Sequence, residues 1–332
     1  MTKKILIIRF SSFGDIIQNM AVIPYLKPDY KIHWLVKKEF AGLVSLSDSI
    51  DQVISFSKED GVIGLIKLAL KLRKEGYTHL YDAHSNIRSR IFTVFFKLFL
   101  NIEYRIRSKD RMKRILLFSF RINKFPKPFK GAISYIEPIR DWIADGGESE
   151  KIDQWHFQND LTKKVDDLLT SFQIDDYITI APSAAWEMKR WPIEHWKQLC
   201  LELREFKIIV LGGPADVFCQ DLADLDPLRI FNFAGKTNLM ESSYLVQKSL
   251  ACISADTGIL HVADTLHVPT LALIGPTAFG FPSSSTSKVC EVDLPCRPCT
   301  KDGRGKCTQD VYQKCMVDIL PVKVASLLRA ML

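Results

Sequence analysis

The sequence lacks the features that mark several common classes of protein. Its longest apolar run, Ile91–Leu100, is interrupted by Lys97, and a helix that spans a bilayer needs about 20 apolar residues. The start of the chain has no signal-peptide pattern, because only four apolar residues separate Lys4 from Arg9. We therefore expect a cytoplasmic protein.

Three glycine-centred motifs of α/β enzymes are also missing. The chain has no G-x-G-x-x-G after its first strand-like run, no G-x-x-x-x-G-K-S/T and no G-x-S-x-G. Their absence counts against a dinucleotide dehydrogenase, a P-loop enzyme and an α/β-hydrolase. The composition itself is that of a soluble globular protein, with 47% hydrophobic and 25% charged residues in 332 positions. That length suggests about two domains.

Apolar runs of strand length alternate with segments of helical spacing, which indicates βαβ units and parallel sheets. The expected strands are Lys4–Phe10, Tyr30–Val36, Gln52–Phe56, Thr78–Tyr81, Tyr177–Ile180, Lys207–Leu211, Arg229–Asn232, Ala251–Ser254 and Thr270–Ile274. Residues 103–130 have no clear pattern and are expected to be irregular. We therefore predict two doubly wound α/β domains, 1–155 and 156–315, followed by a helical segment at 316–332.

The stretch Leu250–Thr277 contains a strand-length apolar run, the turn Asp256-Thr257-Gly258 and then helical spacing. Free amides at the start of such a helix, together with the helix dipole, form a binding site for phosphate. His261 lies one turn further along the same face. The alternative is that Asp256 or Thr257 only caps the helix.

Other polar residues also follow the expected strands directly. In open α/β sheets, ligands bind beyond the carboxyl ends of the strands. The residues at these positions are Asp15, Asp82, His84, Ser183 through Lys189, and Asp216. If the two domains face each other, these loops line one central cleft.

Four segments, in this order, resemble the heptosyltransferases of glycosyltransferase family 9. They are ILIIRFSSFGDII, APSAAWEMKRWPIEHW, IIVLGGPAD and ISADTGILHVADTLHVPTLALIGPT. The resemblance implies a GT-B fold, two Rossmann-like domains facing a cleft, with the final helix crossing back to the first domain. It also implies an inverting, metal-independent transfer of a heptose from ADP-heptose to the inner core of lipopolysaccharide.

The resemblance assigns roles to individual positions. Asp15 matches the catalytic base, which takes the proton of the attacking hydroxyl, and Lys189 matches the lysine that stabilises the departing diphosphate. Helix capping is the alternative for Asp15 and for Asp216. The other implied donor-binding positions are Gly14, Ser183, Asp216, Asp256, Thr257, Gly258 and His261. The implied acceptor-binding positions are Asp82, His84, Asn86, Arg88, Arg107, Lys109 and Arg111.

Basic residues are concentrated in one part of the chain. Residues 97–130 hold eleven Lys or Arg against Glu103 and Asp110, so this segment carries +9 while the whole chain carries +7. Such a segment suits an anionic partner, and the alternative is a solvated basic face. With the resemblance, the expected partner is an anionic Kdo–lipid A acceptor at the inner leaflet of the membrane rather than a nucleic acid, so we expect a peripheral membrane enzyme.

Five of the eight cysteines lie between Cys290 and Cys315. In a reducing compartment such a group favours a metal site over disulfides. Four thiolates suit structural zinc or iron, although the spacing is not that of a standard zinc finger. The candidate ligands are Cys296, Cys299, Cys307 and Cys315 in the loop 290–315. No cofactor is expected for catalysis.

Two departures from the family pattern keep alternatives open. Ser134-Tyr135-Ile136-Glu137-Pro138 stands where relatives have a His-Val-x-x-Arg signature, and the cysteine group is absent from the best-known members. A protein acceptor, another nucleotide-sugar donor or an epimerase activity are the enzymatic alternatives. A catalytically inactive protein that binds a nucleotide or glycan is the alternative from another class.

Overall fold

The computed structural model describes residues 3–57, 59–98, 100–147 and 149–332. The chain forms two compact units, Met1–Asp110 with Ala132–His156, and Arg111–Gly131 with Phe157–Leu332. The observed link at residues 156 and 157 lies beside the boundary predicted at 155. The basic segment Arg111–Gly131, expected in the first domain, belongs to the second unit.

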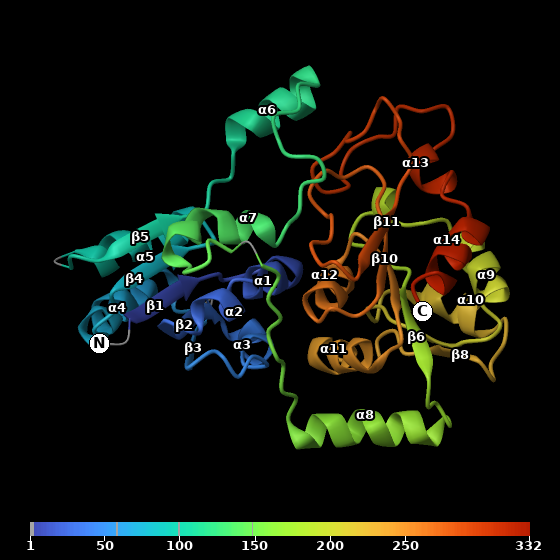
Figure 1. Cartoon of the computed structure of the whole chain (residues 1–332), viewed down its shortest axis with the longest axis horizontal. Helices are drawn as coiled ribbons and strands as arrows, with labels where there is room; N and C mark the ends of the chain where they lie inside the picture. Colours follow the sequence, from blue (N-terminus) through green and yellow to red (C-terminus); the bar gives the residue numbers. More distant parts are fainter. Residues whose placement is uncertain (1–2, 58, 99, 148) are drawn as a thin grey trace. The chain divides into compact units, whose positions relative to one another are not determined.

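The first unit is built on a five-stranded parallel sheet with strand order β3-β2-β1-β4-β5 (Figure 1). Its strands are β1 (Lys3–Ile8), β2 (Tyr30–Lys37), β3 (Gln52–Phe56), β4 (His79–Asp82) and β5 (Glu103–Ile106). Its helices are α1 (Phe13–Met20), α2 (Ile23–Leu26), α3 (Ala41–Val44), α4 (Gly61–Leu72), α5 (Ile87–Lys97) and α7 (Ile133–Ile136), with 3-10 turns η1 (Lys38–Phe40), η2 (Arg73–Glu75) and η3 (Glu137–Trp142).

Both faces of this sheet are buried, which explains why β1 is an unbroken apolar run. Leu6 and Ile8 join a buried cluster with Phe92 of α5. Ile5 and Ile7 point to the opposite face, because side chains alternate along a strand, and they are also fully buried. Each such side chain contributes about 2 kcal/mol of hydrophobic stabilisation.

The second unit has a six-stranded parallel sheet with strand order β11-β10-β9-β6-β7-β8. Its strands are β6 (Tyr177–Ala181), β7 (Lys207–Val210), β8 (Ile230–Asn232), β9 (Cys252–Ala255), β10 (Thr270–Leu273) and β11 (Ser287–Cys290). Its helices are α6 (Arg111–Phe120), α8 (Asn159–Ser171), α9 (Ile193–Glu202), α10 (Gln220–Ala223), α11 (Leu239–Lys248), α12 (Gly258–Thr265), α13 (Lys314–Val317) and α14 (Pro321–Arg329), with 3-10 turns η4 (Glu187–Lys189) and η5 (Val217–Cys219).

Helices cover the two faces of the second sheet: α9 and α14 lie on one side, and α11 and α12 on the other (Figure 1). Leu328 of α14 and Trp196 of α9 share one buried cluster with strand residues such as Leu273. Within the second unit, α14 packs against α9. Burial of Val324 and Leu328 in this core is the physical reason.

The predicted strands are confirmed to within one or two residues at their ends. The expectation of an irregular segment at 103–130 is wrong, because it contains β5 and α6. Helix α6 was missed because its segment was interpreted from its basic charge, although its apolar residues recur with a helical period; Leu117 is its one buried residue among those described. Strand β11 also lacks a strong apolar pattern, since it is a partly exposed edge strand.

Strand register decides which loops meet at the carboxyl edge of each sheet. In the first unit Ile8 of β1 pairs with Asp82 of β4. In the second, Ala181 of β6 pairs with Ser254 of β9, and Ala255 pairs with Leu273 of β10. The loops that follow these strands are therefore neighbours, as the sequence analysis requires.

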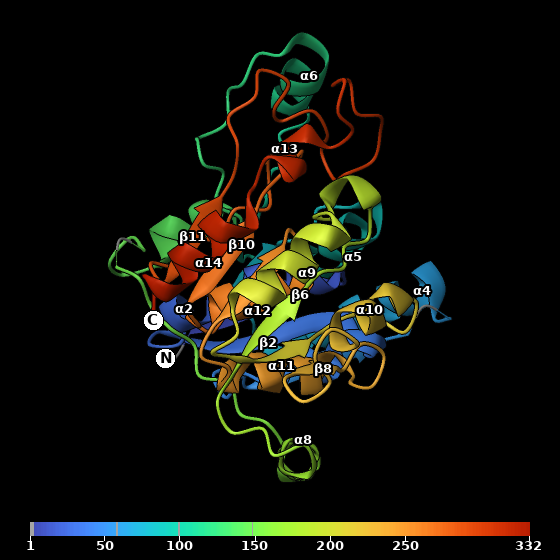
Figure 2. The same ribbon diagram turned by 90° about the vertical axis from the view of Figure 1, so that its right-hand side faces the viewer.

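Within the part of the chain that the structure describes, no helix is long and apolar enough to cross a membrane. Figure 2 shows the second unit from the side, where α6 and the loop before α13 lie next to each other. The guanidinium of Arg121 connects the two, because it donates to the carbonyls of Cys296 and Pro298 at 3.2 Å each.

Candidate functional site

Asp15 lies in the first turn of α1, just beyond the carboxyl end of β1. Ser12 is the N-cap residue of this helix, so Asp15 does not cap it. Oδ2 of Asp15 is 2.5 Å from Nη2 of Arg9 and accepts a hydrogen bond from Ser12 Oγ at 2.8 Å. Oδ1 accepts a hydrogen bond from the Tyr135 hydroxyl at 3.0 Å. The carboxylate is thus held from both sides.

These donors keep Asp15 ionised. Burial alone would raise the pKa of Asp15, but the Arg9 charge and the hydroxyls of Ser12 and Tyr135 outweigh burial and lower the pKa to about 2. The side chain is nevertheless 42% exposed. Asp15 is therefore a charged carboxylate that a substrate can reach.

Arg107 organises the surroundings of Tyr135. Its guanidinium lies 3.9 Å from the centre of the Tyr135 ring and donates to Ser134 Oγ at 2.7 Å. The Arg107 charge also contributes to the lowered pKa of Asp15. Arg107 was predicted to bind an acceptor, and the structure brings it into the environment of the predicted base.

His84 also lies near the base. Its ring packs against Phe10, with centroids 5.0 Å apart. Burial first, and then the charges of Arg9 and Lys109, lower the pKa of His84 to about 4. The imidazole is therefore neutral at neutral pH, where it can donate or accept one hydrogen bond at each nitrogen.

Asp82 and Asn86 have structural roles that the sequence analysis does not anticipate. The Asp82 carboxylate is completely buried. It accepts hydrogen bonds from the amides of His84 and Ser85 and from Ser89 Oγ. Asn86 forms a reciprocal capping box with Ser89 at the start of α5. The structure leaves no accessible carboxylate at Asp82, so this residue does not fit the predicted direct contact with an acceptor.

The remaining predicted acceptor residues do not all lie in one unit. Arg88 is exposed on α5, and Lys109 is half-buried beyond β5. Both belong to the first unit, together with Asp15 and His84, whereas Arg111 begins α6 of the second unit.

Lys189 and Asp256 form a buried ion pair at the carboxyl edge of the second sheet. Nζ of Lys189, in η4, is 2.9 Å from Oδ2 of Asp256, which follows β9. The same oxygen accepts a hydrogen bond from Thr277 Oγ1 at 2.7 Å, and Oδ1 is 3.9 Å from Nε2 of His261. Burial would raise the pKa of Asp256, but Lys189 and then His261 lower it. The structure thus brings Lys189 to Asp256 and His261, which were predicted together in the segment Leu250–Thr277.

Two glycines, which the sequence analysis does not identify, let loops close over this pair. A Cβ atom at Gly280 would lie 2.1 Å from Cγ of Asp256, and one at Gly303 would lie 2.7 Å from Cγ of Lys189. Gly303 also has a φ of +95°, which favours glycine. Close backbone packing therefore fixes both side chains of the pair.

The helix start at Thr257 and Gly258 has the features expected of an anion site. Thr257 is the N-cap of α12, but its side chain makes no capping hydrogen bond and lies 3.1 Å from Ser254 Oγ instead. The first amides of α12 therefore have no side-chain acceptor of their own, and they carry the positive end of the helix dipole. Ser183, in the loop after β6, and Gly14, in the first turn of α1, were also predicted for the donor, and both are half-buried.

Asp216 closes a glycine turn. Its Oδ2 accepts a hydrogen bond from the Gly213 amide at 2.7 Å, and Oδ1 is 3.9 Å from Nη2 of Arg190. It is the N-cap residue of η5 but makes no side-chain capping bond. Oδ2 of Asp216 is thus held by the turn, while Oδ1 lies on the side of Arg190.

The cysteines do not form the predicted metal site. In the described parts of the chain, no group of three or more His, Cys, Asp or Glu residues is placed to hold a metal ion. Cys315 is buried among core residues such as Met316, and burial raises the pKa of its thiol to about 11. The structure therefore gives no support for structural zinc or iron at Cys296, Cys299, Cys307 and Cys315. Cys200, Cys219 and Cys252 are buried core residues, as predicted.

Arg9, Tyr135 and Thr277 are the neighbours of the site that the sequence analysis missed. Tyr135 comes from a segment 120 residues away from Asp15, and no local pattern reveals such a contact. Thr277 is the last residue of the segment Leu250–Thr277 that resembles the family, and this position was its only sign of a role near the site.

Comparison with known proteins supports the resemblance seen in the sequence. The family model described as glycosyltransferase family 9 (heptosyltransferase) matches residues 65–310. A lipopolysaccharide core heptosyltransferase from Haemophilus influenzae, OpsX, is 25% identical over 285 residues, which cover 82% of this chain and 78% of the relative.

Two solved structures match almost the whole chain. The ADP-heptose lipopolysaccharide heptosyltransferase II of E. coli superposes with a TM-score of 0.72 at 20% identity, covering 99% of this chain and 98% of the other. The E. coli heptosyltransferase WaaC with ADP superposes with a TM-score of 0.65 at 18% identity, covering 99% and 100%. The two Rossmann-like units are therefore those of the GT-B fold. Together with the family match over most of its length, this places the chain in glycosyltransferase family 9, the heptosyltransferase family.

Proposed function

We propose that this enzyme transfers a heptose from ADP-heptose, with inversion, to an anionic inner-core acceptor of lipopolysaccharide of the Kdo–lipid A type. The observation that carries the mechanism is Asp15, an ionised and accessible carboxylate at the carboxyl edge of the first sheet. The names of the relatives support the substrates, since they are heptosyltransferases of lipopolysaccharide and one was solved with ADP.

In the proposed reaction, an acceptor hydroxyl attacks the anomeric carbon while the bond from that carbon to the diphosphate breaks. The hydroxyl proton passes to Asp15. Oδ2 of Asp15 is already occupied by Arg9 and Ser12, so we assign the proton to Oδ1, which has one bond, from Tyr135. The oxonium that forms on attack is far more acidic than a carboxylic acid, so a carboxylate of low pKa still accepts its proton.

The leaving diphosphate gains negative charge that has to be stabilised. We assign this task to Lys189, to the amides at the start of α12 and to Ser183. Asp256 and His261 are assigned to the hydroxyls of the sugar, and Asp216 to the ribose. Because these groups are fixed by buried contacts, they need little rearrangement when charge develops.

For the acceptor we propose charge recognition by Arg88, Arg107 and Lys109 of the first unit and by Arg111 of the second, which are assigned to its carboxylates and phosphates. His84, as a neutral imidazole, is assigned to a hydrogen bond with the acceptor. The basic segment around these cations suits the anionic inner leaflet of a membrane, where each basic residue near the surface contributes about 1 kcal/mol. We therefore propose a cytoplasmic enzyme that associates peripherally with that membrane.

Transfer by purified enzyme tests the proposal. ADP-heptose and Kdo–lipid A are supplied together, ADP release is measured, and the glycolipid product is identified by mass. Asp15→Asn is expected to lower kcat at least about a hundredfold, while Asp29→Asn, at an exposed position of the same unit, leaves it unchanged. Unchanged transfer by Asp15→Asn would refute the role of this base, and transfer from another sugar nucleotide in preference to ADP-heptose would refute the donor.

A further inference from the structure

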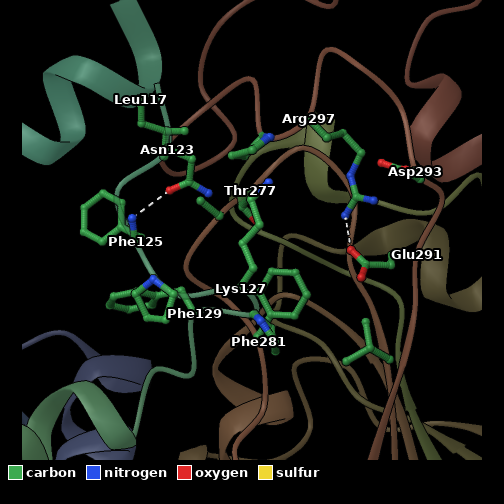
Figure 3. Close-up of a pocket in the computed structure, with 15 residues that line it drawn as sticks. Leu117, Asn123, Phe125, Lys127, Phe129, Thr277, Phe281, Glu291, Asp293 and Arg297 are labelled. Atoms are coloured by element: carbon green, nitrogen blue, oxygen red, sulfur yellow. Dashed lines mark hydrogen bonds and ion pairs between the residues drawn. The ribbon is translucent and has the colours of Figure 1, made fainter. Parts of the chain in front are cut away.

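A pocket of about 540 Å³ lies within the second unit, and it is lined in part by Thr277, whose hydroxyl donates to Asp256. Figure 3 shows Phe125 and Phe129 on one side of it and the Glu291–Arg297 ion pair on the other. Its volume is within the range of pockets that bind small molecules. The proposed donor and acceptor residues do not line it.

The wall of the pocket is mainly apolar. Leu117, Phe125, Phe129, Ala278, Phe281 and Val289 contribute to it. Phe125 and Phe129 pack edge to face against each other at 5.5 Å, and both also pack against Phe279. Such edge-to-face contacts fix the orientation of the rings, so the pocket is preformed.

Most polar groups of the wall already have partners. The Asn123 carbonyl oxygen accepts a hydrogen bond from the Phe125 amide, and Thr277 donates to Asp256. The Arg297 guanidinium pairs with Glu291 at 2.7 Å and donates to the backbone carbonyls of Gly275 and Ile274. A sugar would need several free partners, so these contacts favour an apolar occupant.

The wall of the pocket carries two cations, Lys127 and Arg297, and two carboxylates, Glu291 and Asp293, but the segment that forms one side of it is basic. Residues 111–131 contain seven Lys or Arg and no Asp or Glu. Lys127 lines the pocket, and both it and Lys124 are exposed, with no ion pair among the residues that the structure describes. Phe120 is 64% exposed and Met112 70% exposed on the adjoining helix α6. Exposed apolar side chains interspersed with cations are typical of segments that lie at a lipid surface.

We propose that residues 111–131 and the pocket beneath them bind an anionic lipid, with one acyl chain in the pocket and the anionic headgroup on Lys124 and Lys127. The chain would displace water from the Phe125, Phe129 and Phe281 surfaces, and the headgroup would bring the negative charge that these cations lack. This deepens the proposed function, on which it rests for the identity of the lipid, by giving the acceptor or its membrane a defined binding site.

Binding to the unmodified full chain tests the pocket first, independently of transfer. Alkyl phosphates of increasing chain length, each below its micelle concentration, are compared with inorganic phosphate by isothermal titration. Each methylene group that enters the pocket is expected to tighten binding by up to about fourfold, until the pocket is full. Equal affinity for inorganic phosphate and dodecyl phosphate would overturn the proposal, even if the enzyme transfers heptose normally.

Two variants separate the chain from the headgroup. Ala278→Trp fills the pocket and is expected to abolish the dependence on chain length, whereas Ala330→Trp, at an exposed end of α14, preserves it. Lys127→Gln is expected to weaken binding of every phosphate a few-fold and keep the chain dependence. Circular dichroism checks the fold of each variant. A folded Ala278→Trp variant that retains the chain dependence would also overturn the proposal.

Competition distinguishes the two sources of such a lipid. Dodecyl phosphate that inhibits transfer to an acylated acceptor, but not to a deacylated one, would assign the pocket to the acceptor's own chain. If neither reaction is inhibited, but dodecyl phosphate releases the protein from vesicles of phosphatidylcholine and phosphatidylglycerol, the occupant is a bilayer lipid. If dodecyl phosphate neither inhibits heptose transfer nor releases the protein from the vesicles, the pocket is not a lipid-binding site.

Discussion

The hydroxyl of Tyr135 donates a hydrogen bond to Oδ1 of Asp15 at 3.0 Å, although the two residues are 120 positions apart. Tyr135 lies in the segment where this chain departs from the His-Val-x-x-Arg signature of its relatives. A residue from the atypical segment therefore orients the oxygen that we propose receives the acceptor proton.

Removing this hydroxyl should change the pH dependence of the reaction. Tyr135→Phe keeps the ring under Arg107 but removes one of the groups that lower the pKa of Asp15. The acid limb of the pH profile of kcat/KM is expected to move upward, by about one pH unit or less, since Asp15 has to be ionised to accept a proton. Tyr104→Phe, at an exposed tyrosine of β5, should leave the profile in place. A lower kcat/KM at every pH, with the acid limb at an unchanged pH, would indicate a structural role for Tyr135 instead.

The same carboxylate should make stability depend on pH at the acid end. The pKa of Asp15 is about 2 in the folded chain against about 3.9 in an unfolded one. A lowered folded-state pKa stabilises the fold fully above the unfolded-state pKa, and this contribution is lost as the pH falls from about 4 to about 2. Asp15→Asn also leaves the buried Arg9 guanidinium without its carboxylate.

We therefore expect Asp15→Asn to be less stable than the unmodified chain at neutral pH, with the difference shrinking below about pH 4. Urea unfolding across the acid range measures it, with Asp29→Asn as the control. A difference that is constant from pH 7 down to pH 2 would show that the charge of Asp15 does not contribute to stability.

Lys189 should dominate the affinity for the nucleotide. Lys189→Ala removes a charge-assisted contact of the kind that contributes about 1.5–3 kcal/mol, so ADP is expected to bind about 10 to 100 times more weakly. The matched control is Lys197→Ala, which removes a partly exposed lysine paired with Glu194. Titration of ADP with and without EDTA should give the same affinity, because the lysine and the backbone amides supply the positive charge. ADP binding that is unaffected by Lys189→Ala would place the diphosphate elsewhere.

Gly280 should tolerate no side chain. A methyl group there would lie 2.1–2.5 Å from the carboxyl atoms of Asp256, and relieving this overlap is expected to cost about 1–3 kcal/mol. It should also separate Asp256 from Lys189 and Thr277, and so reduce ADP affinity. At Gly213 the nearest atom would be 3.4 Å away, an ordinary contact, so Gly213→Ala serves as the control for the free energy of unfolding. Equal stability of the two variants would show that the loop at Gly280 is free to move.

Local sequence patterns were sufficient for the elements and for much of the site. Apolar runs located nine strands, because strands that are buried on both faces need nearly continuous apolar residues. Asp15, Lys189 and Asp256 were identified because each comes shortly after a predicted strand, within a segment that resembles the family. Strand β11 was missed because it is a partly exposed edge strand, and helix α6 because the basic charge of its segment was taken as a sign of irregular structure.

Only the tertiary structure decided which of these residues have functional groups that a substrate can reach. The tertiary structure buries the Asp82 carboxylate in a turn, packs Cys315 among core residues, and gives Asp15 a hydrogen bond from Tyr135. Sequence determines where a polar residue lies along a strand or helix, because that depends on local period and turn chemistry. Its burial, charge state and partners depend on residues far away in the chain, which meet only when the sheets and their loops are assembled.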